Sequence, residues 1–209
     1  MDSIPKMSMI GVAILAGGKS RRMGTDKGLV KLDGVALVER IARQVTSIAP
    51  EIFVITNRID DYKQFGYPVV ADAFPGIGPL GGLYTALEHD QHDYTLILSC
   101  DMPFVNLDLL LYMKDIIGRY DAVVPRLSSD APPEPLRAIY HKRCMTHMLE
   151  SIESGMRKAI SFYRNIDVRY VERNEIEMVD PGLTSFFNAN TQEDLLRALD
   201  YVESYPLMD

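Results

Sequence analysis

The chain has 209 residues, the length of one ordinary domain, and 47% of them are hydrophobic, enough for a substantial core. Its formal net charge of −7 argues against a nucleic-acid-binding protein and against a protein that binds anionic membranes. Two cysteines exclude a disulfide scaffold, and the sequence has neither a signal-peptide pattern nor a membrane-spanning run, so we expect a cytoplasmic protein.

Short apolar runs alternate with amphipathic segments along the whole chain. The runs at 10–15, 52–56, 69–71, 95–99 and 122–124 predict strands, and apolar residues at helical spacing predict helices near 37–48, 107–117, 145–152 and 195–202. This order predicts an α/β fold with three layers, a mostly parallel central sheet covered by helices on both faces. One domain over 1–209 is the simplest division, and the polar, proline-rich stretch 127–135 is the best candidate for a loop.

The first predicted strand ends in a glycine-rich, basic loop. Gly17 and Gly18 let main-chain amides approach an anion, while Lys19, Arg22 and Lys27 bring positive charge into an acidic chain. A P-loop would need glycine in place of alanine four residues before Gly17, and the dinucleotide pattern G-x-G-x-x-G is absent. A solvated surface turn is the plain alternative, but a triphosphate site fits the pattern better.

A base pocket is indicated after the second and third predicted strands. Asn57 and Asp72 each follow a predicted strand, and a glycine-rich stretch at 76–82 lets a flat ligand lie against the main chain. The Asp72 carboxylate suits the two N–H donors of guanine. Asn and Asp are also common turn residues, and for Asn57 the two interpretations are about equally good.

Asp101 directly follows the strand predicted at 95–99. A carboxylate at this position needs a partner, and Mg²⁺ prefers one or two carboxylates together with phosphate oxygens. A helix N-cap is the alternative, but Asn106 is the better cap for the next helix. Cys100 is expected to be a small buried residue.

The second half of the chain offers candidate contacts for an acceptor molecule. Arg137, Arg157 and Lys158 are cations near predicted turns or strands, although exposed helix cations are an equally good interpretation of the last two. Asn188 and Asn190 alternate on a predicted strand, which would place both amides on one face. Beyond them, Thr191 begins a capping box that predicts a helix start.

Two motifs carry a resemblance to a known family. Leu15–Lys27 (LAGGKSRRMGTDK) and Cys100–Pro103 (CDMP) resemble the nucleotidyltransferase superfamily, and the Ala-Gly-Gly form resembles its molybdenum cofactor guanylyltransferases. The resemblance implies a Rossmann-like fold with a nucleotide-binding half at about 9–125 and an acceptor-binding half at about 126–209. The residues it implies for the nucleotide are Leu15, Ala16, Gly17, Gly18, Lys27, Asn57, Asp72, Gly81 and Asp101.

The resemblance also implies the reaction. Such an enzyme transfers GMP from GTP to molybdopterin with Mg²⁺ held by Asp101, and Lys27, Arg22 and Asp101 would be catalytic. Arg137, Arg157, Lys158, Asn188 and Asn190 would hold the acceptor, and molybdenum cofactor-handling proteins would be transient partners. A cytidylyltransferase, a sugar-phosphate nucleotidyltransferase and a non-catalytic GTP-binding adaptor are the alternatives.

Overall fold

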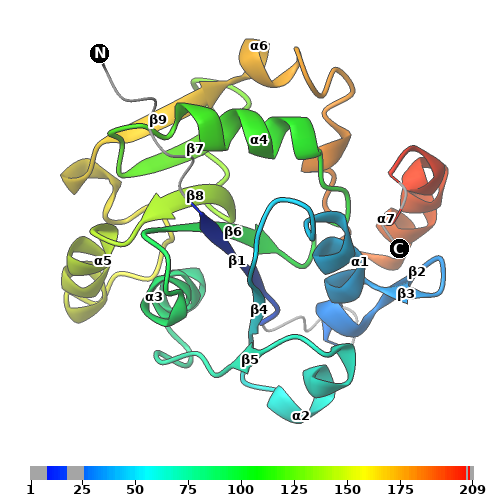
Figure 1. The fold of residues 1–209 in the computed structure, drawn as a ribbon, viewed down its shortest axis with the longest axis horizontal. Coiled ribbons are helices and arrows are strands. Elements are labelled where there is room, and N and C mark those ends of the chain that lie inside the picture. Colours follow the sequence, from blue (N-terminus) through cyan, green and yellow to red (C-terminus); the bar gives the residue numbers. More distant parts are fainter. Residues whose placement is uncertain (1–8, 18–25, 206, 208–209) are drawn as a thin grey trace.

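The computed structural model describes residues 9–17, 26–205 and 207, and it contains a seven-stranded sheet in the order β5-β4-β1-β6-β8-β7-β9 (Figure 1). Its strands are β1 (Ile10–Leu15), β4 (Ile52–Ile55), β5 (Val69–Val70), β6 (Tyr94–Ser99), β7 (Ala122–Arg126), β8 (Arg137–His141) and β9 (Val168–Glu172). Strand β8 runs antiparallel to both of its neighbours, and the other pairings in this sheet are parallel. The predicted mostly parallel α/β fold is therefore confirmed.

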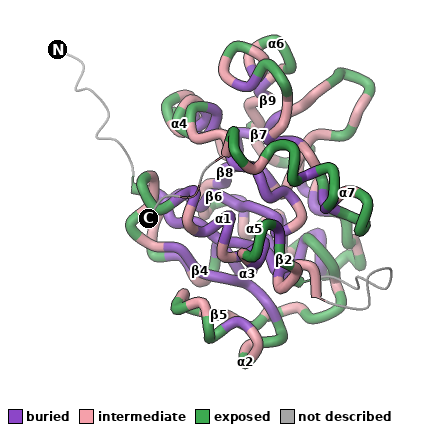
Figure 2. The backbone as a smooth tube through the Cα atoms, turned by 90° about the vertical axis from the view of Figure 1, so that its right-hand side faces the viewer, coloured by how far each residue is buried: buried purple, intermediate pink, exposed green. Residues whose placement is uncertain are grey.

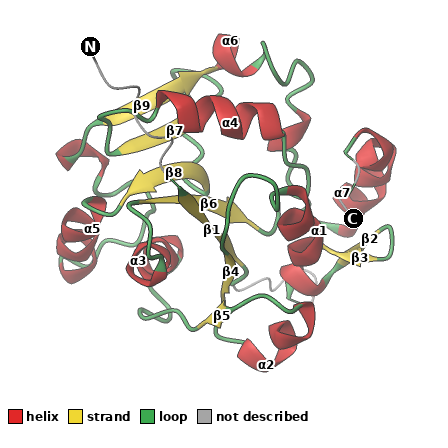
Figure 3. Ribbon diagram, in the orientation of Figure 1, coloured by secondary structure: helices red, strands yellow, loops and turns green. Residues whose placement is uncertain are grey.

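Helices cover both faces of this sheet (Figure 3). They are α1 (Leu37–Gln44), α2 (Ile59–Tyr62), α3 (Pro79–His89), α4 (Leu107–Ile116), α5 (Cys144–Glu153), α6 (Arg173–Ile176) and α7 (Gln192–Ala198). In β1 the side chains alternate between two cores: Ile10, Val12 and Ile14 pack with α1 and α4, whereas Ala13 and Leu15 pack with α3 and α5. Burial on both faces explains why this strand is apolar throughout, as Figure 2 also shows for the central strands.

Two of the helix starts follow the capping residues expected from the sequence. The Asn106 side chain accepts a hydrogen bond from the Leu109 amide at the start of α4. Thr191 and Asp194 form a complete capping box at the start of α7. Within the described residues, no helix is long and apolar enough to cross a membrane.

Three local predictions differ from the structure. The segment of Asn188 and Asn190 is not a strand, because a short 3-10 helix (Thr184–Phe186) leads into irregular chain and Phe187 packs against Phe104. Strand β9 and the small hairpin β2 (Lys31–Leu32) and β3 (Val35–Ala36) were not predicted. Helix α7 ends at Ala198 and continues as a 3-10 helix to Ser204.

A small apolar cluster joins the region of β2 and α1 to the C-terminal helix α7. Leu32 and Leu37 pack there with Phe104 and with Leu195 and Ala198 of α7. This packing places the beginning of the C-terminal helix beside the loop that follows β6, and so beside the carboxyl edge of the sheet.

Candidate active site

The loops after β1 and β6 begin side by side at the carboxyl edge of the sheet. The Ala16 amide donates to the Ile55 carbonyl over 3.0 Å, and the Cys100 amide donates to the Leu15 carbonyl over 3.2 Å. Gly17 is exposed, and a Cβ added there would meet no heavy atom of the described residues within 4 Å. Open main chain at this edge is where ligands of parallel α/β sheets bind.

Three predicted site residues from distant parts of the sequence meet at this edge. The Lys27 ammonium lies 3.5 Å from Asp101 Oδ2 and also donates to Asn190 Oδ1. The Ala189 amide donates to the Asp101 carbonyl over 2.8 Å and holds the C-terminal segment in place. A cation, a carboxylate and an amide therefore face one partly exposed space, which suits a negatively charged substrate.

The Asp101 carboxylate has one oxygen engaged and one directed into this cluster. Ser99 Oγ donates to Oδ1 over 2.6 Å, while Oδ2 faces Lys27, and the side chain is 27% exposed. One or two protein carboxylates, completed by phosphate oxygens and water, are the donor set that Mg²⁺ commonly takes. These residues fit the ion that the sequence suggests.

Two further ionisable groups lie near Asp101. Burial raises the pKa of the Glu134 carboxyl group. The charge of Arg137 opposes this rise, and the charge of Asp101 adds to it. Glu134 is therefore a second carboxyl group near Asp101. No motif pointed to Glu134 as a site residue. Burial also raises the pKa of the Cys100 thiol, which agrees with an inert buried cysteine.

Asp26 positions Lys27, and the sequence did not reveal this role. Its carboxylate accepts from the Gly28 amide over 3.2 Å and so caps the 3-10 helix Lys27–Leu29. The same oxygen accepts from the Tyr62 hydroxyl over 2.6 Å, and Arg58 Nη1 lies 3.7 Å from the other oxygen. A side chain at Gly28 would overlap the Tyr62 hydroxyl, so the turn that carries Lys27 is closely packed.

Asn57, Asp72 and Gly81, which were predicted for the base pocket, lie close together. Asn57 Oδ1 accepts from the Asp72 amide over 3.1 Å, and Asp72 Oδ1 accepts from the Phe74 amide over 2.9 Å and from Thr85 Oγ1 over 3.2 Å. A Cβ at Gly81 would lie 3.2 Å from that same oxygen. Asp72 thus also stabilises a turn, which was the alternative role considered for it.

The predicted acceptor contacts do not share one environment. Arg137 is fully buried, donates to the Phe104 carbonyl over 3.3 Å and lies over the Phe186 ring, and burial lowers its pKa to about 10. This burial favours a structural role, and the prediction that Arg137 holds the acceptor stays a prediction. Its contacts instead link the loop after β6 to the segment that carries Asn190.

The other acceptor candidates are exposed. Arg157 and Lys158 lie at the surface, and a Cβ added to Gly78 would be 3.9 Å from the Arg157 carbonyl, so this basic turn adjoins the loop before α3. The Asn188 amide donates to the Phe186 carbonyl over 3.2 Å, unlike Asn190, which reaches Lys27. The predicted site residues Gly18 and Arg22 lie outside the described residues.

The sheet order, the exposed main chain at Gly17 and the cluster at Asp101 are those of a nucleotidyltransferase with a Rossmann-like fold. Residues 12–168 match the model of the MobA-like NTP transferase domain. A probable molybdenum cofactor guanylyltransferase from Clostridium perfringens is 37% identical over 191 residues, which cover 88% of this chain and 95% of the relative. The chain therefore belongs to the molybdenum cofactor guanylyltransferase family.

Other relatives agree with this assignment. A relative with the same description from Pelotomaculum thermopropionicum is 35% identical, with 88% of this chain and 89% of the relative covered. The solved structure of molybdopterin-guanine dinucleotide biosynthesis protein A from Archaeoglobus fulgidus has a TM-score of 0.80 at 27% identity and covers 93% of this chain and 100% of its own. A 4-diphosphocytidyl-2C-methyl-D-erythritol synthase from Anaerococcus prevotii shares the fold, with a TM-score of 0.69 at 15% identity and coverage of 95% and 100%.

Proposed function

We propose that this chain transfers GMP from GTP to the terminal phosphate of molybdopterin and releases pyrophosphate. The observation that carries the proposal is the meeting of Lys27, Asp101 and Asn190 at the carboxyl edge of the sheet, in a chain whose relatives are named guanylyltransferases. The division into a nucleotide-binding half and an acceptor-binding half is part of this proposal.

The reaction is a direct displacement at phosphorus. An oxygen of the acceptor phosphate forms a bond to the α-phosphorus of GTP, and the bond from that phosphorus to the oxygen bridging to the β-phosphate breaks. Because the acceptor is already an oxyanion, the protein need not supply a nucleophile. The chain aligns two anions and neutralises their charge through Lys27 and the exposed main chain at Gly17.

A bound Mg²⁺ would supply further neutralisation of the phosphates, with Asp101 as its protein ligand. Lys27 shares this carboxylate, so the cation and the metal ligand remain adjacent when substrate enters. Asn190 also accepts a hydrogen bond from the ammonium and so limits the directions in which Lys27 can reach a phosphate.

Guanine selection would rest on Asp72. Its Oδ1 is occupied by the Phe74 amide and Thr85, which hold the carboxyl group in one orientation and leave Oδ2 for the N–H donors of guanine. Arg157, Lys158 and Asn188 remain the proposed acceptor contacts, and transfer of the product to a molybdenum cofactor-handling protein is the proposed downstream step.

The test is calorimetric titration of GTP, CTP, ATP and UTP with Mg²⁺, followed by turnover with molybdopterin. We expect selective GTP binding that Asp72→Asn weakens at least tenfold, because asparagine keeps an oxygen for the Phe74 amide but loses the carboxylate. Asp130→Asn, in the exposed loop, is the matched control. Preferential CTP binding would favour a cytidylyltransferase, GTP binding without turnover would favour an adaptor, and the absence of nucleotide binding by the folded chain would refute the proposal.

A further inference from the structure

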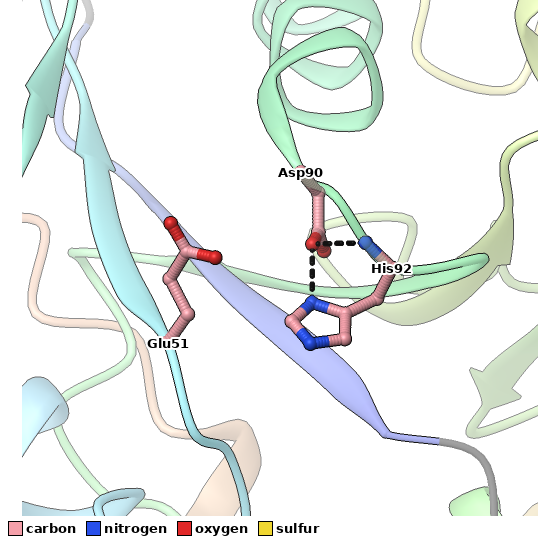
Figure 4. Close-up of side chains that lie close together, drawn as sticks. All are labelled: Glu51, Asp90 and His92. Carbon is pink, nitrogen blue, oxygen red and sulfur yellow. Dashed lines mark hydrogen bonds and ion pairs between the residues drawn. The ribbon is translucent and has the colours of Figure 1, made fainter.

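A second cluster of metal-binding side chains lies at the opposite edge of the sheet from the candidate active site. Glu51 precedes β4, Asp90 ends α3 and His92 precedes β6 (Figure 4). One potential ligand atom from each residue lies within 4.8 Å of the others. Along β1, Gly11 beside this cluster and Leu15 beside the active site are separated by about 13 Å, so the two sites are distinct.

The Asp90 carboxylate is fully buried, and only one of its oxygens is satisfied. Oδ1 accepts from the His92 amide over 2.9 Å and lies 2.7 Å from His92 Nδ1. Oδ2 has no hydrogen-bond partner among the described residues. A buried carboxylate oxygen in this state calls for a ligand, and a cation meets that need.

The surrounding chain makes room for this carboxylate. A Cβ added at Gly11, in the middle of a strand, would lie 2.5 Å from Asp90 Cγ. Glycine weakens a strand interior, and its presence marks a close approach by another group. Lys142 is the nearby cation, but its Nζ donates to the Asp90 main-chain carbonyl over 2.6 Å and so holds the turn.

We propose that Glu51, Asp90 and His92 bind a borderline divalent transition-metal ion, with Zn²⁺ the best match. An imidazole nitrogen and two carboxylate oxygens are Zn²⁺ ligands, whereas Mg²⁺ prefers an all-oxygen octahedron. Bonds of about 2.0–2.2 Å place tetrahedral ligands about 3.4 Å apart, and the candidate ligand atoms already lie within 4.8 Å of one another, so binding needs a contraction of at most about 1.4 Å. Glu51 is only partly buried and makes this movement. The ion ties the start of β4 to the turn between α3 and β6, with water as the fourth ligand.

The proposal is tested by titrating chelator-treated full-length protein with ZnCl₂. The protein carries the background substitution Asp101→Asn, so that the active-site carboxylate does not contribute to the number of Zn²⁺ ions bound per chain. We expect one Zn²⁺ per chain by calorimetry and elemental analysis, and at least tenfold weaker binding in Glu51→Gln and in His92→Ala. Glu150→Gln is the matched control, because Glu150 forms an exposed pair with His147 of the same residue types. Its Zn²⁺ affinity should equal that of the background.

Three results would overturn the site. They are no Zn²⁺ binding by the background protein, undiminished binding in Glu51→Gln, and displacement of Zn²⁺ by a hundredfold excess of Mg²⁺. If His92→Ala does not fold, as judged by circular dichroism, Glu51→Gln alone decides. Since no nucleotide is present, the result is independent of the proposed guanylyltransferase reaction.

Discussion

Replacing Lys27 by alanine should separate catalysis from stability. The Lys27 ammonium and the Asp101 carboxylate are 3.5 Å apart with side chains 21% and 27% exposed, and partly solvated pairs of this kind contribute about 1 kcal/mol or less to folding. In the reaction the same ammonium faces charge that develops on the phosphates. Removing one such oriented group typically lowers the rate by about 100-fold or more, equivalent to about 2.7 kcal/mol.

The assay compares kcat/KM for GMP transfer with the free energy of unfolding in urea, for Lys27→Ala and for Lys31→Ala. Lys31 is an exposed lysine four residues further along and serves as the control for a lost surface charge. We expect Lys27→Ala to lose at least 100-fold in kcat/KM and Lys31→Ala to keep its activity, with both stabilities within about 1 kcal/mol of the parent. An unchanged rate in Lys27→Ala, or a loss of stability as large as the loss of activity, would refute this reasoning.

Three further predictions address the metal ligand, the packing and the pH dependence. Asp101→Ala should reduce turnover at least 100-fold with an unchanged circular dichroism spectrum, and near-normal turnover would contradict the metal assignment. Gly11→Ala should lower the free energy of unfolding by about 2–3 kcal/mol, because its Cβ would lie 2.5 Å from Asp90 Cγ. For a chain of this length, about 1 kcal/mol corresponds to a change of 2–3 °C in the melting temperature. A melting temperature that changes by no more than this would disprove the clash. Burial raises the pKa of Glu175, but hydrogen bonds from Arg169 and neighbouring donors outweigh burial and bring that pKa to about 2. The lowered pKa stabilises the fold by up to about 3 kcal/mol above about pH 4.5, and this stabilisation is lost as the pH falls toward 2. The free energy of unfolding of Glu175→Gln should therefore depend less on pH in this range than that of the parent. Equal pH dependence in the two proteins would argue against the assignment.

The sequence was most informative where local pattern determines position. Asp101 follows a strand that is apolar on both faces, and the carboxyl ends of neighbouring parallel strands necessarily meet, so its place beside the loop of Gly17 could be predicted. The approach of Asn190 to the same edge was suggested by resemblance alone, and no pattern in the residues indicated its contact with Lys27.

Burial and long-range packing were harder to predict from the sequence. Arg137 begins a strand whose pairing with β6 turns its side chain into the interior, and an isolated arginine in a strand-like run gives no sign of that. The alternation of Asn188 and Asn190 resembled a strand, but the aromatic packing of Phe187 favours an irregular path. The contact between Asp26 and Tyr62 joins residues 36 positions apart and depends on tertiary structure.

The hydrogen bond between Lys27 and Asn190 joins residues 163 positions apart, so the active-site cluster cannot assemble until nearly the whole chain has been synthesised. A ribosome-bound chain that stops short of Asn190 has no amide to hold the Lys27 ammonium. Docking of α7 through Leu195 and Ala198 is then the last step that orders the site. Catalytic competence of this enzyme would therefore depend on the segment that carries Asn190 and on the docking of α7.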